Sequence, residues 1–522
     1  MPRDVRRLCL SSVTAAAVAA TSSVLLAQAP GSEDVARRQL ESGRAFARQG
    51  NYTEALKDFR AVAETHAATS VADNAWLEIA RYHFDVANDL AEAAAAVDAI
   101  LKKYPTSDSA PDAYLIAGRL ALARSRQPDD LAAALANFDR VHRLFPTAAA
   151  VPASLYYAAD VHYYGRRFTD ALANLGRVTA EYPSSAAAAD AYLASGRALL
   201  ATGDPVLGME EMQQARNRAP KSAAAATALA HQTLLHRLYV RARGGPAYVL
   251  SAEAAGPPRL QNGIALATTD GTAIFWATEN GVGAVAAADA SRVPSAARPR
   301  GLVVDAAGTL LVNDGVSLRP ASGTPLSFAV PQPNGTVKPL DKIVAAVQLS
   351  NGDWLVMDQD ERALHRFSRA GAHGGPFTAG RFTRLAVNGF DEVAAIDRDQ
   401  KVIAIFDRAG QPIARLPFRM PAYNLENPED VTFDALGHLY VLDREALAVF
   451  SPYPAGTASP SAGGAPAAAP AATPAGGFRL LTTLLASDNN AAGFRRGRAI
   501  AVDRSGAVFL YDDRAQRILV YR

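Results

Sequence analysis

Cysteine is almost absent from this chain of 522 residues. The single cysteine, Cys9, lies within an N-terminal segment that has the features of a targeting signal, so the rest of the chain contains none. Without cysteine a chain forms no disulfide bond, holds no zinc through thiolates and carries no thiol nucleophile. Disulfide-rich domains, zinc knuckles and thiol enzymes are therefore excluded.

The chain also lacks an excess of charge of either sign. Lysine and arginine number 53, aspartate and glutamate number 51, and residues 1–29 alone carry the net charge of +2. Balanced charge in the remainder argues against general binding to nucleic acid or to an anionic membrane. A composition that is 49% hydrophobic and 20% charged is typical of a globular protein, and we expect no membrane span in the mature chain.

The first 29 residues predict export. Basic residues within 1–7 precede an apolar, alanine-rich stretch over 8–26, and the small-residue pattern Ala-Gln-Ala follows at 27–29. Cleavage is expected after Ala27 or Ala29, by either the general or the twin-arginine route, and an uncleaved anchor is the alternative. The mature protein is thus expected to be periplasmic or extracellular.

Residues 30–243 carry a helical repeat. Residues 104–119 recur at 182–197 with most positions identical. Amphipathic helical patterns end at prolines 105, 146, 183 and 220, which are spaced by 41, 37 and 37 residues. A period in this range predicts an α-solenoid, here with about five repeats and a capping helix that ends near Tyr239.

The repeats resemble tetratricopeptide repeats, in which small residues let two helices of a hairpin pack closely. The first unit, 43–59, shows this best with Gly43, Phe46, Gly50, Tyr52, Ala55 and Phe59. The hairpins are most similar to those of the cell-envelope variety found in outer-membrane assembly and Tol-Pal-associated proteins. The resemblance implies a superhelix whose concave face is lined by the first helix of each hairpin.

That concave face is expected to bind a protein or peptide partner. The family's register places on it Arg44, Arg48, Glu78, Tyr82, Asp85, Arg119, Tyr156, Asp160, Tyr163 and Arg197. Tyrosine and arginine are the residue types that anchor peptides. For Tyr156 and Tyr163, packing between hairpins remains an equal alternative.

Residues 245–522 carry a second repeat, of β type. A small polar residue, usually aspartate, ends one apolar strand, a turn residue follows three positions later, and another aspartate lies six residues beyond the turn. Five copies share one register, with turn residues at 308, 352, 391, 437 and 506 and with aspartate in place of glycine at 391, and a weaker sixth copy has its turn at 271. Glycine supplies positive φ and aspartate caps backbone groups, so these aspartates are expected to be structural.

The β repeat resembles the NHL repeat, and its six copies imply a six-bladed β-propeller. A Pro/Ala-rich insert at 453–478 explains the longer spacing before the last copy. We expect this half and the helical half to fold independently, because each has its own repeat.

The starts of the first strands supply five charged residues for a propeller mouth: Arg300, Arg384, Glu429, Asp430 and Arg498. Six-bladed propellers include lactonase-like hydrolases that hold a divalent cation among converging oxygen ligands, whereas three of these five residues are arginines. No metal, cofactor or catalytic residue is therefore expected. The sequence predicts an exported protein-interaction scaffold of the bacterial cell envelope. The alternatives are a metal-dependent propeller hydrolase with a helical docking arm and a carbohydrate or peptidoglycan binder.

Overall fold

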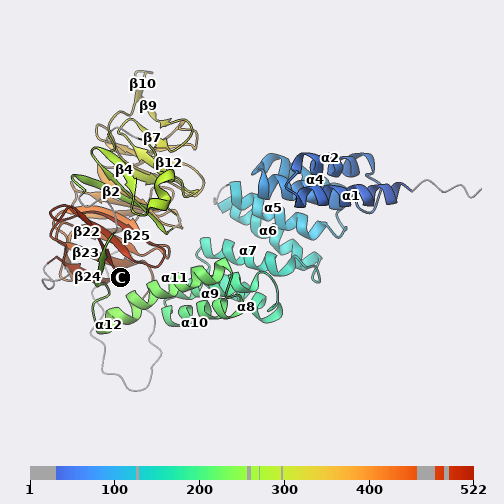
Figure 1. The fold of residues 1–522 in the computed structure, drawn as a ribbon, viewed down its shortest axis with the longest axis horizontal. Coiled ribbons are helices and arrows are strands. Elements are labelled where there is room, and N and C mark those ends of the chain that lie inside the picture. The colour runs from blue at the N-terminus through green and yellow to red at the C-terminus, as the bar shows by residue number, and fades with distance from the viewer. Residues whose placement is uncertain are drawn as a thin grey trace, which may run out of the picture.

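The structure is a computed structural model that describes residues 31–124, 128–254, 260–269, 271–295, 298–454, 477–486 and 493–522. It consists of a helical domain followed by a β domain (Figure 1). The expected signal segment at 1–29 lies outside the described residues, and so does most of the expected insert, 455–476.

The helical domain is built from five hairpins. They are α1 (Ser32–Arg48) with α2 (Tyr52–Arg60) and its π-helical extension η1 (Ala61–Thr65); α3 (Ala72–Arg81), extended by η2 (Tyr82–Val86), with α4 (Leu90–Lys103); α5 (Ala110–Arg124) with α6 (Pro128–Leu144); α7 (Val151–Tyr164) with α8 (Phe168–Glu181); and α9 (Ala188–Ala201) with α10 (Pro205–Arg218). The final helices are α11 (Ala223–Leu235), η3 (His236–Arg241) and α12 (Ala242–Gly244). The predicted α-solenoid is therefore confirmed.

Glycines inside the hairpins let paired helices approach closely. A Cβ atom on Gly118 in α5 would lie 2.3 Å from Cε1 of Phe138 in α6. Gly196 and Gly208 bring α9 and α10 together, since a Cβ atom on Gly196 would lie 2.6 Å from the carbonyl oxygen of Gly208. The small-residue pattern of the sequence thus has a direct steric cause.

The β domain is a six-bladed propeller. Its blades are β2 (Gly263–Thr269), β3 (Ala273–Thr278) and β4 (Gly281–Ala284); β5 (Gly301–Val304), β6 (Leu310–Asn313), β7 (Ser317–Pro320) and β8 (Leu326–Ser327); β11 (Ile343–Gln348), β12 (Trp354–Asp358), β13 (Ala363–Phe367) and β14 (His373–Ala379); β15 (Phe382–Val387), β16 (Val393–Asp397), β17 (Val402–Phe406) and β18 (Pro412–Pro417); β21 (Pro428–Phe433), β22 (Leu439–Asp443), β23 (Ala446–Ser451) and β24 (Arg479–Leu485); and β25 (Gly497–Val502), β26 (Val508–Asp512), β27 (Arg517–Tyr521) and β1 (Leu250–Glu253).

The propeller is closed by its own N-terminal strand. Strand β1 pairs with β27, so the beginning of the β domain forms the outer strand of the last blade. The inner strands β2, β5, β11, β15, β21 and β25 contact one another in a closed ring. Short extra elements, η4 (Ala287–Arg292), β9 (Ala329–Pro331), β10 (Val337–Pro339), β19 (Arg419–Met420) and β20 (Tyr423–Asn424), lie between these strands in sequence.

The predicted turn chemistry is confirmed in all six blades. Positions 271, 308, 352, 391, 437 and 506 have positive φ values between 60° and 91°, including Asp391 at 60°. The aspartates around the turns accept backbone hydrogen bonds. The Oδ1 atom of Asp305, for example, accepts from the N–H groups of Ala307 (3.0 Å) and Thr309 (2.7 Å). These aspartates stabilise turns, as expected.

The two domains share a hydrophobic core. The turns that follow the inner strands of three blades contact the end of α7, α11 and η3, and one cluster of buried residues runs through both domains. Within it, the hydroxyl of Tyr239 in η3 lies 2.9 Å from Nε2 of His438 in the propeller. Separating the two halves would expose the apolar surface of this interface to water, and independent folding of each half stays a prediction.

Candidate functional site

Ion pairs connect the first helices of successive hairpins. Nε of Arg44 in α1 donates to Glu78 in α3 at 2.9 Å. Nη2 of Arg119 in α5 donates to Asp85 in η2, also at 2.9 Å. The structure thus brings together four residues of the predicted concave face, and pairing leaves little net charge on them.

Tyr82 lies in a hollow between the first two hairpins. The hollow has a volume of about 190 Å³ and is lined by Ala47, Tyr52, Ala55, Leu56, Phe59, Glu78, Arg81, Tyr82, Asp85 and Val86. The ring centroids of Tyr52 and Tyr82 are 5.0 Å apart, and Val86 is 51% exposed. The π-helical turn η2 contributes Tyr82, Asp85 and Val86, and such turns are frequent at functional sites.

Tyr163 lies in the domain interface, so the structure corrects its expected role as a groove anchor. Its side chain is 8% exposed, and its ring centroid lies 5.1 Å from that of Phe390 in the propeller. The guanidinium of Arg197 lies 4.8 Å from the Tyr163 ring centroid. The two residues therefore support domain docking, because burial against the propeller leaves the Tyr163 ring no free face for a partner.

Three residues of the predicted concave face remain, namely Tyr156, Asp160 and Arg48. Tyr156 and Asp160 lie near Arg197, and burial, together with the negative charge of Asp160, raises the pKa of the Tyr156 phenol. The ring of Tyr156 is 5.3 Å from that of Tyr157 and is half-buried. Arg48 is exposed at the end of α1.

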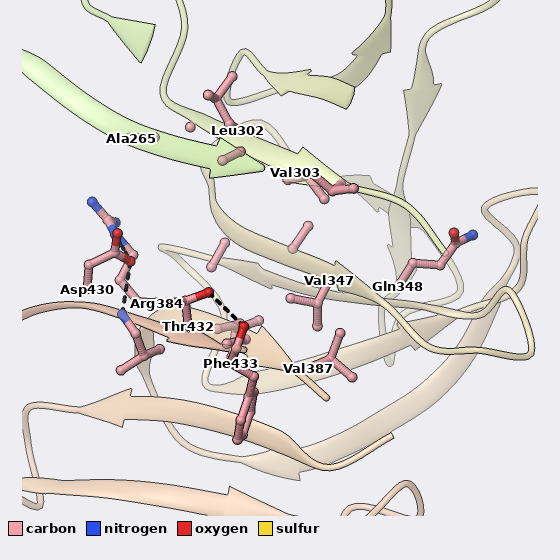
Figure 2. A pocket seen from close by; sticks show the side chains of 18 of the residues that line it. Ala265, Leu302, Val303, Val347, Gln348, Arg384, Val387, Asp430, Thr432 and Phe433 are labelled. Atoms are coloured by element: carbon pink, nitrogen blue, oxygen red, sulfur yellow. Dashed lines mark hydrogen bonds and ion pairs between the residues drawn. The ribbon is translucent and has the colours of Figure 1, made fainter. Parts of the chain in front are cut away.

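The inner strands of the propeller enclose a channel with a volume of about 530 Å³. Arg300, Arg384 and Asp430 line it near the starts of β5, β15 and β21. Apolar and polar groups both line it, and Figure 2 shows the apolar side chains of Leu302, Val303, Val347, Val387 and Phe433, the last three toward the ends of their strands.

The charges at the channel mouth are unevenly paired. Nε of Arg384 is 3.7 Å from Oδ1 of Asp430, which is longer than a hydrogen bond. Burial raises the pKa of Asp430 to about 6, although backbone N–H groups of Val431 and Ile500 donate to the carboxylate at 3.0 Å. Among the described residues, the Arg300 guanidinium has no hydrogen-bond or ion-pair partner.

Glu429 and Arg498 lie at the rim and do not line the channel. Oxygen atoms of Glu429 are 2.7 Å from Arg444, 3.5 Å from Arg398 and 3.7 Å from Arg498. Three arginines therefore neutralise one carboxylate there. Within the described part of the chain, no group of three or more His, Cys, Asp or Glu side chains is placed to hold a metal ion.

The sequence did not indicate a cleft between the two domains. It has a volume of about 960 Å³ and lies between α6, the end of α7 and the fourth and fifth blades. Phe390 and Arg166 border it, and the Arg166 guanidinium lies 4.7 Å from the Phe390 ring centroid. Phe390 follows a strand end in a propeller turn, and no repeat spacing marks it as a docking residue.

Comparison with known families identifies the helical repeat. The family model for the tetratricopeptide repeat matches residues 40–108 and 156–223. The chain thus combines a tetratricopeptide-repeat solenoid with a six-bladed β-propeller. No curated protein sequence matches the chain significantly. In the described residues, no helix is both long and apolar enough to cross a membrane.

Solved structures resemble each half separately. The MamA protein is 16% identical with a TM-score of 0.29, over 36% of this chain and 94% of MamA. Streptogramin B lyase is 9% identical with a TM-score of 0.34, over 53% of this chain and 97% of the lyase. A gluconolactonase from Xanthomonas campestris is 11% identical with a TM-score of 0.34, over 52% of this chain and 94% of that protein. At these values the likenesses carry no functional argument.

Proposed function

We propose that the protein is an exported scaffold that captures a protein partner on its tetratricopeptide-repeat domain, at the hollow around Tyr82. The observation that carries this proposal is the aromatic pair Tyr52 and Tyr82, which lines an open apolar hollow whose acidic neighbours Glu78 and Asp85 are paired with arginines. Tetratricopeptide repeats support protein partners as the class of ligand.

The chemistry of the hollow describes the partner segment. Because Glu78 and Asp85 already pair with arginines, their charges contribute little further binding energy, and apolar burial must supply most of it. An extended segment that inserts one apolar side chain between Tyr82 and Leu56 fits this surface. Export and a cell-envelope setting are further parts of the proposal, supported by the basic and apolar N-terminal residues.

Peptide display against the whole chain tests the proposal. Selected peptides should share an apolar anchor, and Tyr82→Ala should weaken their binding by tenfold or more, since a buried aromatic anchor contributes about 2 kcal/mol. Leu144→Ala is the matched control, because Leu144 is an exposed apolar residue, at 58%, outside the hollow. Unchanged binding by a folded Tyr82→Ala variant would refute the role of the hollow.

The export part has its own test. The protein should fractionate outside the cytoplasm with an N terminus near residue 28 or 30, as N-terminal sequencing would show. Full-length cytosolic protein would overturn this part without affecting the hollow.

A further inference from the structure

The propeller channel has the form of a small-molecule site. Its volume of about 530 Å³ lies within the usual range of roughly 300 to 1,000 Å³ for ligand pockets. Such pockets combine apolar walls with a few polar groups that fix ligand orientation. Here apolar side chains from four blades line the channel, and Val347, Val387 and Phe433 among them lie toward the ends of the inner strands (Figure 2).

Polar groups at the two ends of the channel differ in what they already bind. At the end of the inner strands, Oε1 of Gln348 accepts from Ala306 N–H at 2.9 Å and its Nε2 donates to the Gly352 carbonyl at 2.8 Å. Ser350 likewise donates from both N–H and Oγ to Asp391, at 2.7 and 2.6 Å. These groups hold neighbouring turns together and have little capacity left for a ligand.

At the start of the inner strands, donors remain. The Nη1 atom of Arg384 donates to the Thr383 carbonyl at 3.0 Å. The Nε atom of Arg384 is 3.7 Å from Oδ1 of Asp430, which is too far for a hydrogen bond. Arg300 has no guanidinium partner among the described residues. The Arg384 guanidinium thus lies beside one carboxylate that is already bound by two backbone N–H groups. The Arg300 side chain, which also lines the channel, lies against Gly315 in the turn after β6. The surplus charge is positive.

We propose that the channel binds a small amphipathic carboxylate, whose carboxylate pairs with Arg300 and Arg384 and whose apolar body lies along the channel wall. Guanidinium groups suit this ligand because their fixed N–H forks match carboxylate oxygens, and such charge-assisted bonds are stronger than neutral ones. The apolar wall adds affinity by burial.

The site opens away from the helical domain. The docked turns, which contain Phe390, His438 and Ser505, follow the inner strands, whereas Arg300 and Arg384 lie near the strand starts. Binding in the channel therefore does not depend on the proposed function of the Tyr82 hollow, and either can fail without the other.

Calorimetric titration of the whole protein with octanoate tests the proposal. Octanamide has the same body without the charge, and acetate has the charge without the body. Octanoate should bind at least tenfold more tightly than either. Arg300→Ala and Arg384→Ala should each weaken octanoate binding by about tenfold or more. The exposed Arg419→Ala, with a side chain 71% accessible, should leave it unchanged, as should Tyr82→Ala.

Asp430→Asn should increase the affinity for octanoate because it removes the competing negative charge, whereas a misfolded variant would bind octanoate more weakly. If octanoate binds no better than octanamide, or if folded Arg300 and Arg384 variants bind it as the wild type does, the proposal is wrong. A fatty acid and the C terminus of an apolar peptide share this chemistry. Titration with acetyl-leucyl-leucine and with its C-terminal amide distinguishes these two sources. If the ligand is a peptide C terminus, acetyl-leucyl-leucine should bind more tightly than octanoate and its amide should not; if the ligand is a fatty acid, octanoate should bind more tightly than acetyl-leucyl-leucine.

Discussion

Replacing Tyr239 by phenylalanine removes a single hydroxyl group from the interface between the two domains. That hydroxyl lies 2.9 Å from Nε2 of His438 and 3.0 Å from Oγ of Ser451, and all three side chains are buried. His438 keeps its bond to Asp434 at 2.8 Å, and Ser451 keeps one from the N–H of Tyr453 at 3.1 Å. The change therefore removes one hydrogen-bond partner from Nε2 of His438 and one from Oγ of Ser451.

The structure gives the size of the effect. A buried polar group that loses its hydrogen-bond partner costs about 1 to 3 kcal/mol. Because His438 and Ser451 each keep another hydrogen bond, each should cost about 1 kcal/mol, and Tyr239→Phe should lower the free energy of unfolding by about 2 kcal/mol. Tyr192→Phe is the control. Among the described residues, the Tyr192 hydroxyl makes no hydrogen bond, and its loss should change the free energy by less than about 0.5 kcal/mol.

Urea unfolding with two probes measures the result. Far-ultraviolet circular dichroism follows mainly the helical domain. Fluorescence of Trp276 and Trp354 follows the propeller when both proteins also carry Trp76→Phe, which removes the tryptophan of α3. Because the core is continuous, Tyr239→Phe should shift both transitions to lower urea concentration by the same amount. If only the fluorescence transition moves, the interface does not couple the domains and the reasoning fails.

Three further changes should have measurable effects. Phe390→Ala should destabilise the protein by about 2 kcal/mol in the same unfolding assay, less than a full core truncation because Phe390 is only half-buried. Gly118→Ala should cost about 1 to 3 kcal/mol through overlap with Phe138, whereas Gly176→Ala, with open space around the new methyl group, should stabilise by up to about 1 kcal/mol, as thermal unfolding would show. Burial lowers the pKa of His231 to about 4, from an ordinary value near 6.5. Between these pH values the unfolded chain binds a proton that the folded chain does not, so the free energy of unfolding should fall by about 3 kcal/mol as the pH drops from about 6.5 to about 4. His231→Gln should remove much of this fall, as unfolding measured at several pH values would show.

The propeller turns show where sequence reasoning succeeds. A hairpin turn with positive φ places a local demand on one residue, and that demand recurs in each blade, so spacing alone identified even Asp391 in the glycine position. The glycines of the helical hairpins are similar, because the residue that each one contacts lies within the same repeat, as with Gly118 and Phe138. Both features repeat, and repetition makes them visible in one sequence.

The domain interface shows why the rest was missed. Tyr163 lies in the first helix of its hairpin, as the helical repeat predicts. Its partner, Phe390, lies more than two hundred residues away in the turn after β15. The register of a repeat gives the face on which a side chain lies, whereas contact with a second domain depends on tertiary packing that occurs once. The same reason explains why the mouth residues Arg300 and Arg384 could be placed on strand starts but the unequal pairing of their charges could not.

The continuous core bears on how the two proposed sites relate. If a flexible linker joined the domains, a partner held at the Tyr82 hollow and a ligand in the propeller channel would have no fixed separation. Instead, Tyr239 and Tyr163 lie in a buried interface, and the solenoid extends from it to α1 and α2 at its far end (Figure 1). Moving one domain against the other would expose apolar surface and break buried hydrogen bonds, so the interface opposes such motion. A rigid junction of this kind holds two binding surfaces at a constant distance and orientation, which is the property that a scaffold requires.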